Sequence, residues 1–387
     1  MRKTNVMIVV AGLNIGGLEV VIANLCRHID RAKFNVSICC LKVVGSIGRE
    51  LIAEGYSVHA LEKPRGLRNN YISWLQLLAL TRKLGIQVLH SHSPDSLLDV
   101  SLCKLFRRSL RVIHTFHYGN YPNRVRQDLR IERLFSRVPD ELVAVGDEQK
   151  VKIARTFDLP VERLTTIWNG VPTGRASLPS RLPASVRARE GPVIGTACTL
   201  IEQKGLNYLL DVAHLLKQRG RQATFVVAGE GHLRGELERE RSRRGLDDDV
   251  VLLGWVDNAG TAFIPYVDIF FLPSLWEAMS VVVLEAMEAG KPVVVTNVGE
   301  NNRVIEHGVD GWVVEPRDVE SMAAILERLI GDHELRARAG ARAQAKARTQ
   351  FSVEKMVAAY EALYENKAGG GHQGHDHSGR TSSPPGI

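Results

Sequence analysis

Short apolar runs alternate with amphipathic segments along most of the chain. After each run, the apolar positions recur with the spacing of a helix that has one buried face. Strands this apolar, separated by helices, are typical of a parallel sheet that is covered on both faces. We therefore predict an α/β fold. In the first half of the chain the runs lie at 6–12, 34–42, 57–63, 87–93, 111–117 and 141–147.

The pattern is interrupted once, near the middle of the chain. Residues 171–192 are rich in Pro, Ser and Arg and show no periodicity, which indicates a linker. The alternation then restarts. The sequence thus predicts two doubly wound, Rossmann-like domains, 1–172 and 192–350, joined by residues 173–191. In the second half the runs lie at 192–200, 223–231, 250–256, 268–274, 292–299 and 311–316.

The end of the chain has a different composition. From Asp318 to about Lys367 the pattern is helical and rich in Ala and Arg. Residues 368–387 are polar and rich in Gly, Ser and His, so we expect a disordered tail. The tail histidines could bind a metal weakly, but an incidental polar tail is the simpler interpretation.

Composition is that of a soluble globular protein, with 44% hydrophobic and 24% charged residues. No apolar run approaches the roughly 20 residues that a membrane-spanning helix needs. Residues 1–23 faintly imitate a signal peptide, but their apolar run is short, so a buried first strand is the better interpretation. The five cysteines form no CxxC pair. We expect core thiols and a reducing cytoplasm rather than disulfides or zinc.

Charge is distributed unevenly between the halves. Residues 1–170 carry 25 Lys and Arg against 15 Asp and Glu, whereas the rest of the chain carries 25 against 28. A basic first half suits an anionic partner, such as a membrane surface or a phosphorylated acceptor. A solvated basic face without a partner is the alternative.

Two carboxylates occupy an unexpected place in the stretch 274–290, "SLWEAMSVVVLEAMEAG". The segment reads as a strand end, a turn and a helix that is apolar almost all round. Glu277 lies in the turn and Glu285 lies in the helix, although Glu is almost never fully buried unless it is paired. The helix N-terminus offers free amides to an anion. Two carboxylates beside an anion site would suit a ligand with a diphosphate and vicinal hydroxyls, such as a nucleotide sugar. The alternative is that each is paired with a nearby Arg.

Other unusual residues also follow strands, where ligands bind in open α/β sheets. Gly16 and Gly17 open a helix, and Lys204 precedes one, so both places could meet phosphate. His90 and His92 share one face of a strand; they could begin a metal site, but no third ligand is evident. The glycines at 229, 231 and 235 imitate a dinucleotide fingerprint, which is weak evidence on its own.

Taken in order, these motifs resemble a known enzyme family. They are "GGLE" at 16–19, "HSHS" at 90–93, "HTFH" at 114–117, "WNGV" at 168–171, "EQKG" at 202–205, "GEGHLRGELE" at 229–238, 274–294 and 298–318. The set resembles glycosyltransferase family 4, the retaining, nucleotide-sugar-dependent transferases of the GT-B fold. That fold places two Rossmann-like domains around a central cleft. Its C-terminal helix, here about 351–367, crosses back to the first domain.

The resemblance implies a role for each matching position. Glu285 would hold the ribose hydroxyls, Glu277 the donor sugar and Lys204 the diphosphate, while His117 would lie near the reacting carbon. Glu277, Lys204 and His117 are thus the candidate catalytic residues. The other donor-side positions are Gly16, Gly17, Thr199, Gly229, Ala278, Met279, Ser280, Val281 and Arg303. The acceptor-side positions are His92, His117, Tyr118 and Asn169. The family needs neither a metal nor another cofactor.

The sequence departs from the family pattern at two positions. The family usually has an Arg where this chain has Thr199, five residues before Lys204. It also often has an acidic residue where this chain has Arg303. We hypothesise that Arg303 replaces the missing charge on the leaving phosphate. The departures leave open a slow enzyme, an unusual donor or an inactive relative.

The resulting expectation is a hexosyltransferase that uses a nucleotide-diphosphate sugar, for example in surface polysaccharide or glycolipid synthesis. The acceptor would be a glycan or a lipid-linked intermediate, and no nucleic acid is expected. The Arg-rich segment 117–137 could lie on an anionic membrane, or it could be an ordinary amphipathic helix. Alternatives are a non-catalytic nucleotide-sugar-binding protein, an epimerase or hydrolase on the same fold and, remotely, an NAD-dependent oxidoreductase. A metal-dependent GT-A transferase is disfavoured because the Asp247–Asp249 cluster precedes its strand.

Overall fold

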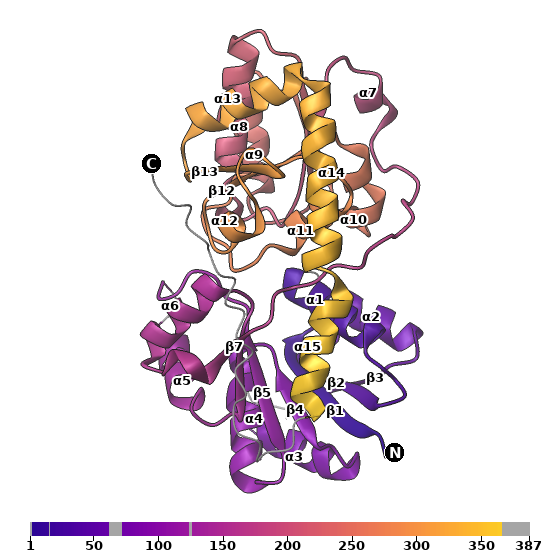
Figure 1. Ribbon diagram of the computed structural model, residues 1–387, viewed down its shortest axis with the longest axis vertical. Coiled ribbons are helices and arrows are strands. Elements are labelled where there is room, and N and C mark those ends of the chain that lie inside the picture. The colour runs from indigo at the N-terminus through magenta and orange to yellow at the C-terminus, as the bar shows by residue number, and fades with distance from the viewer. Residues whose placement is uncertain (1, 15, 62–71, 124–125, 366–387) are drawn as a thin grey trace, which may run out of the picture.

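The computed structural model describes residues 2–14, 16–61, 72–123 and 126–365, which fold into two α/β domains stacked along the long axis (Figure 1). Within these residues, the first domain has a parallel sheet in the order β3-β2-β1-β4-β5-β6-β7. Strands β1 to β6 coincide with the predicted apolar runs, whereas β7 has three residues and is too short to show a period. The strands are β1 (Thr4–Gly12), β2 (Phe34–Val43), β3 (Ser57–Ala60), β4 (Val88–Ser91), β5 (Arg111–Phe116), β6 (Glu141–Ala144) and β7 (Leu164–Thr166).

Helices cover both faces of this sheet. The alternation of β1 shows it: Val6 and Ile8 pack with the helices on one face, while Met7 and Val9 pack with α3 and α4 on the other. All four side chains are fully buried, which is why the run reads as continuously apolar. The helices are α1 (Gly17–His28), α2 (Gly45–Ala53), α3 (Ser73–Lys83), α4 (Pro94–Phe106), α5 (Arg126–Phe135) and α6 (Asp147–Phe157), with a short 3₁₀ helix η1 (Val161–Arg163).

The second domain repeats this architecture with a smaller parallel sheet, in the order β10-β9-β8-β11-β12-β13. Every one of these strands coincides with a predicted run. The strands are β8 (Val193–Ala197), β9 (Thr224–Ala228), β10 (Val250–Gly254), β11 (Ile269–Leu272), β12 (Val293–Thr296) and β13 (Gly311–Val314). The helices are η2 (Glu202–Lys204), α8 (Leu206–Gln218), α9 (Arg234–Arg243), α10 (Ala259–Ala262), η3 (Ile264–Tyr266), α11 (Val281–Glu288), α12 (Asn301–Val304) and α13 (Val319–Gly331).

The C-terminal helical stretch is divided, not continuous. Asp332 ends α13 and caps the next helix, α14 (His333–Gln350), by accepting a hydrogen bond from the Leu335 amide at 2.8 Å. Helix α14 runs along the second domain, and α15 (Val353–Glu365) continues onto the first domain beside α1 (Figure 1). The crossing helix implied by the resemblance is therefore present. Residues 366–387, which include the predicted tail, lie outside the described residues.

The chain crosses between the domains twice, and the two crossings lie side by side. The Val171 amide donates to the Phe351 carbonyl at 2.9 Å, and the Val353 amide donates to the Val171 carbonyl at 2.9 Å. A Cβ on Gly170 would lie 2.5 Å from the Ser352 carbonyl oxygen, so only glycine fits there. The segment after this crossing contains a short helix, α7 (Ala184–Arg187), within the predicted linker. The paired crossings form the natural hinge between the domains.

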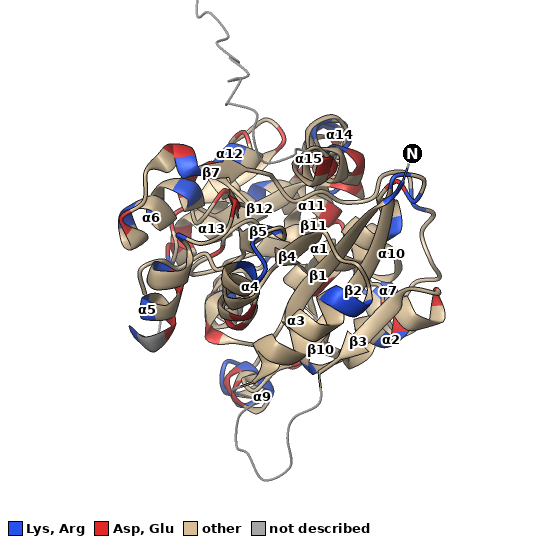
Figure 2. Cartoon of the chain, turned by 90° about the horizontal axis from the view of Figure 1, so that it is seen from below, with Lys and Arg blue, Asp and Glu red and all other residues tan. Residues whose placement is uncertain are grey.

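Lys and Arg lie on the outer helices α5 and α6 with Asp and Glu beside them (Figure 2). All five cysteines are free; four are buried and Cys198 is half-buried. Burial raises the pKa of the Cys26 thiol to about 12, which makes it unreactive. Among the described residues, no helix has the length and apolar character needed to cross a membrane.

Candidate active site

The loop after β11 holds Glu277 in a network of donors. The Glu277 side chain is 6% exposed, and its Oε1 accepts from Lys204 Nζ at 2.5 Å and from Ser274 Oγ at 2.8 Å. Its Oε2 accepts from Gln203 Nε2 at 3.3 Å. The Glu277 carboxylate therefore has a cation and two neutral donors as partners, which offset the cost of its burial. The structure thus brings together two candidate residues that lie 73 positions apart in the sequence.

Close packing of the backbone at Gly205 positions Lys204 beside this loop. The residue ends the 3₁₀ helix η2, and Gly205 follows it with a φ of 62°. A Cβ on Gly205 would lie 2.1 Å from the Pro273 carbonyl oxygen, so glycine allows η2 to pack directly against the end of β11. The Lys204 side chain is 15% exposed and its pKa is raised. Burial opposes the charge, but the Glu277 carboxylate outweighs it, so Lys204 is a cation at the edge of the cleft.

Glu285 lies farther along α11 in a different environment. Its carboxylate is half-buried and has no hydrogen bond or ion pair with any described residue. Burial raises its pKa from 4.5 to about 7, and the charge of Arg175 opposes this shift only partly. A Cβ on Gly260 would lie 2.9 to 3.3 Å from the Glu285 carboxyl atoms, so a bare backbone approaches this group. A desolvated carboxylate without a partner is suited to accept hydrogen bonds from the vicinal hydroxyls of a ligand.

The N-terminus of α11 lies between these two carboxylates. Ala278, Met279, Ser280 and Val281 are each less than a tenth exposed. Their backbone amides donate to no described residue; Val281 is the first residue of the helix, and the other three precede it. A helix of eight residues adds the positive end of its dipole. These amides are therefore available to an anion next to Lys204.

The first domain brings a second helix N-terminus to the same place. Gly16 and Gly17 begin α1, and a Cβ on Gly17 would lie 3.9 Å from Val281 Cγ2 of the second domain. Helix α1, which begins with glycine, and helix α11 are in contact across the domain boundary. This arrangement keeps the backbone at Gly17 close to the start of α11, and the approach of Gly17 to a diphosphate stays a prediction.

Two histidines of the first domain contact each other beyond the ends of β4 and β5. His92 follows β4 and His117 follows β5, and His92 Nδ1 lies 3.0 Å from His117 Nε2, so one ring donates to the other. Burial lowers the pKa of His117 to about 3, which keeps its ring neutral at physiological pH. His92 Nε2 is buried and has no partner among the described residues. The pair therefore offers a polar atom to a ligand without adding charge.

His90, which could have begun a metal site with His92, has a structural role instead. Its Nδ1 lies 2.6 Å from the Tyr364 hydroxyl and its Nε2 lies 2.8 Å from Thr115 Oγ1, so both ring nitrogens are occupied. Within the described part of the chain, no group of three or more His, Cys, Asp or Glu is arranged to hold a metal. His90 instead fastens the crossing helix α15 to the first sheet.

Sequence comparison identifies the family to which this site belongs. Residues 15–175 match the family described as Glycosyltransferase Family 4, and residues 191–332 match the family described as Glycosyl transferases group 1. The alpha-D-kanosaminyltransferase of Streptomyces kanamyceticus is 30% identical over 280 residues, which cover 67% of this chain and 72% of that protein. The chain belongs to the group 1 glycosyltransferases. It is a nucleotide-sugar glycosyltransferase, and the oxidoreductase alternative is wrong.

Two further relatives place this glycosyltransferase among known proteins. The UDP-Gal:alpha-D-GlcNAc-diphosphoundecaprenol alpha-1,3-galactosyltransferase of Escherichia coli is 24% identical over 67% of this chain and 70% of its own length. The crystal structure of Anabaena HepE in complex with UDP-glucose superposes with a TM-score of 0.80 at 19% identity, covering 93% of this chain and 99% of that one. The structural match confirms the GT-B fold.

The remaining candidate positions of the glycosyltransferase lie at the edge of this site or outside it. Thr199 is exposed. Gly229 has a φ of 148°, and a Cβ there would lie 1.8 Å from the Cys198 carbonyl oxygen, so its glycine is required by chain packing. Asn169 donates to the Met279 carbonyl at 3.1 Å, and the carbonyl of Tyr118 accepts from Gln149 Nε2 at 2.9 Å. These contacts connect the loops that carry Tyr118 and Asn169 to α6 and to the segment before α11, and the acceptor-side role of both residues stays a prediction.

Arg303 lies against the other domain. It contacts Asp147 at the start of α6 at 3.3 Å and Glu300 at 3.7 Å, and about half of its side chain is exposed. Its role on the leaving phosphate stays a hypothesis. Sequence reasoning missed the residues that hold the domains together here, namely Gly119, Gln149 and Glu300. The one sequence signal for these contacts was Gly119, a glycine two residues after His117 with no evident role.

Proposed function

We propose that this glycosyltransferase moves a hexose from a nucleoside-diphosphate sugar to an acceptor hydroxyl with retention and without a metal. The observation that carries the proposal is the combination on α11 and its preceding loop. Glu277 and Lys204 form a buried pair, the helix N-terminus has free amides, and Glu285 is an unpartnered carboxylate. These groups match, in order, a sugar, a diphosphate and a ribose.

The division of labour follows from the charges. Lys204 and the α11 amides would stabilise the negative charge that develops on the leaving diphosphate. Glu277 would then turn its acceptor capacity toward a sugar hydroxyl, and Glu285 would accept from the ribose hydroxyls. His117 would meet the donor sugar as a neutral ring, because burial keeps its pKa near 3.

The state of the carboxylates disfavours retention by double displacement through a covalent enzyme intermediate. Glu277 is held by three donors, which lowers its nucleophilicity, and Glu285 lies one and a half turns farther into the helix. Neither is placed as a free nucleophile. We therefore propose that the acceptor attacks from the face that the diphosphate leaves, and that a phosphate oxygen takes the acceptor proton. The enzyme would contribute electrostatic stabilisation and orientation.

A thermal-shift screen tests the donor site. Wild type and Glu285→Ala are measured with UDP-, GDP-, ADP- and dTDP-sugars, and Glu306→Ala, an exposed acid of the same domain, serves as control. A ligand at 100 times its Kd stabilises by about 2.7 kcal/mol, which is a clear shift. We expect a shift for one nucleotide that is lost only in Glu285→Ala. If no nucleotide sugar shifts the wild type, the proposal is wrong.

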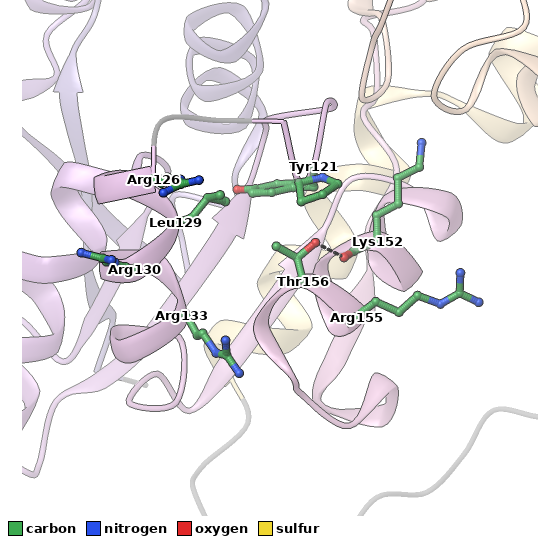
Figure 3. Close-up of a pocket in the computed structure, with 9 residues that line it drawn as sticks. Tyr121, Arg126, Leu129, Arg130, Arg133, Lys152, Arg155 and Thr156 are labelled. Carbon is green, nitrogen blue, oxygen red and sulfur yellow. Dashed lines mark hydrogen bonds between the residues drawn. The ribbon is translucent and has the colours of Figure 1, made fainter.

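The acceptor surface is proposed on the first domain. A groove of about 630 Å³ runs between α5 and α6, and the Tyr121 ring lies across it (Figure 3). Arg133 reaches toward its lower end, whereas Arg130 and Arg155 point outward on opposite sides (Figure 3). Its lining contains no acid: Tyr121, Pro122, Arg126, Leu129, Arg130, Arg133, Lys152, Arg155 and Thr156. An apolar floor with cationic edges suits an acceptor carried on a lipid phosphate.

Flotation on vesicles tests this surface. We expect wild type to float with vesicles that contain an anionic phospholipid and not with neutral ones, and to do so less at high salt. Arg130→Ala/Arg155→Ala should weaken flotation, whereas Arg338→Ala/Arg342→Ala on α14 should not. Equal flotation of the two double variants would exclude the groove, and no flotation of wild type would exclude the cytoplasmic membrane surface as its partner.

A further inference from the structure

A carboxylate of the second domain enters the first domain and caps one of its helices. Glu300 lies between β12 and α12 and is fully buried. Its Oε1 accepts from the backbone amides of Glu148 at 2.7 Å and Gln149 at 3.1 Å, which belong to the first turn of α6. A Cβ on Gly146 would lie 2.1 Å from Glu300 Cγ, so the first domain leaves room for this side chain. An anion at a helix N-terminus is favourable only while the domains are in contact.

The backbone of Glu300 is hydrogen-bonded to the loop between β11 and α11, residues 273–280, which we call the donor loop. Its amide donates to the Ala278 carbonyl at 3.0 Å. Gly299 precedes it with a φ of 55°, and a Cβ there would lie 2.4 Å from the Ala278 oxygen and 2.5 Å from the Glu277 oxygen. The cap and the loop that carries Glu277 therefore move together.

The capped helix is tied in turn to the loop that carries His117. Gln149 Nε2 donates to the Phe116 carbonyl at 3.2 Å and to the Tyr118 carbonyl at 2.9 Å, the two carbonyls on either side of His117. Gln149 Oε1 accepts from the Val145 amide at 2.8 Å, which fixes the orientation of its amide. One side chain of α6 thus holds the backbone around the histidine.

Two other charged side chains, Arg303 and Asp147, lie near Glu300 but outside the buried contact. Arg303 on α12 is 3.7 Å from Glu300 Oε2, and Asp147 on α6 contacts Arg303 at 3.3 Å. This outer pair is half exposed and is therefore screened by solvent. The buried link between the domains is the pair of hydrogen bonds from α6 amides to Glu300.

We propose that Glu300 is a positioning residue for sugar transfer, which caps α6 on domain closure and so holds the His117 loop against the donor loop. The proposal rests on the proposed function for its activity readout. It differs from a general stabilising role because it predicts an effect on turnover with the donor site intact. Apart from Gly16 and Gly17, the candidate nucleotide-binding groups belong to the second domain, and the Glu300 side chain makes no hydrogen bond to any of them.

The test compares Glu300→Gln and Gln149→Ala with Glu306→Gln, an exposed acid of the same segment whose side chain makes no hydrogen bond or ion pair with a described residue. Displacing a reacting group by about 1 Å can cost about 100-fold in rate. We expect kcat to fall 10- to 100-fold in Glu300→Gln and Gln149→Ala, with donor Kd changed less than twofold. The double variant should lose little more than either single one, because both act through one connection.

Hydrogen exchange provides a readout that needs no turnover. In Glu300→Gln we expect faster exchange of the Glu148 and Gln149 amides and unchanged exchange in β8 to β13. If wild type transfers no sugar, the proposed function fails while exchange still decides the closure contact. Unchanged kcat, or amides that keep their protection, would overturn the positioning role. A parallel loss of donor binding and second-domain protection would also overturn it, since Glu300 would then be a structural residue of its own domain.

Discussion

At the scale of single residues, the two carboxylates that drew attention in the sequence differ in their partners. Glu277 is paired, and Glu285 is not. For Glu285, the pKa is raised from 4.5 to about 7, so the folded state binds more protons than the unfolded state between these values. The free energy of unfolding must therefore decrease as pH rises through this window, and the loss is complete above about pH 7.

Glu285→Gln should remove this loss. We expect the variant to match wild type at pH 4.5 and to exceed its stability at pH 8 by about 1 to 3 kcal/mol, since one pKa unit corresponds to about 1.4 kcal/mol. The check is the thermal midpoint of the ligand-free protein at both pH values, with Glu306→Gln as control. The same difference at both pH values would contradict the raised pKa.

The Lys204–Glu277 pair gives the second prediction at this scale. Lys204→Met leaves a buried carboxylate without its cation, which costs about 3 to 5 kcal/mol, whereas Lys204→Met/Glu277→Gln removes both charges and should be less destabilising. Both variants should lose about 100- to 1,000-fold in kcat, because the leaving diphosphate loses a charged donor. Thermal midpoints and single-turnover rates measure the two effects. A double variant less stable than Lys204→Met would show that the pair is not coupled.

At the scale of elements, the sequence predicted most of the strands because buried parallel strands are apolar at every position. The same feature explains what it missed. β7 is too short to show a pattern, and the break between α13 and α14 depends on capping by Asp332 inside a continuously helical composition. Strand order and ion pairs such as Lys204 with Glu277 depend on tertiary structure, which the periodicity of the sequence does not predict. Glu277 and Lys204 could be singled out because each follows a strand and precedes a helix, whereas Glu285 was singled out as an acid within an apolar helix.

The crossing helix α15 gives a prediction for an element. Tyr364 and Thr115 occupy the two nitrogens of the buried, neutral His90. Tyr364→Phe would leave one nitrogen without a partner, which costs about 1 to 3 kcal/mol. Tyr360→Phe should cost less, because its hydroxyl makes a longer contact of 3.3 Å to Thr115, which keeps His90 as its partner. Hydrogen exchange in α15 and the thermal midpoint compare the two variants, and equal losses would contradict this ranking.

At the scale of the whole molecule, the two domains contact each other through backbone atoms. Gly119 of the first domain packs on the donor loop so closely that a Cβ would lie 2.1 Å from the Glu277 carbonyl carbon and 2.2 Å from the Ala278 nitrogen. These are backbone atoms, which cannot move aside as a flexible side chain could. The domains are joined by the paired crossings at Val171 and Phe351, so we expect a clash at Gly119 to be relieved by a rotation about these crossings that separates the domains.

Gly119→Ala should therefore open the enzyme without unfolding either domain. We expect a larger radius of gyration by small-angle X-ray scattering, donor affinity within about twofold of wild type, and kcat lowered by about 100-fold, since the first domain would no longer reach the bound sugar. Gly331→Ala is the matched control, because a Cβ there meets nothing within 4 Å. The closed contact would have no part in transfer if Gly119→Ala scattered like an open protein and still turned over at the wild-type rate. If the radius of gyration and the turnover rate both stayed unchanged, the loop after β5 would have shifted locally without separating the domains. The prediction that Gly119→Ala opens the enzyme would then be wrong.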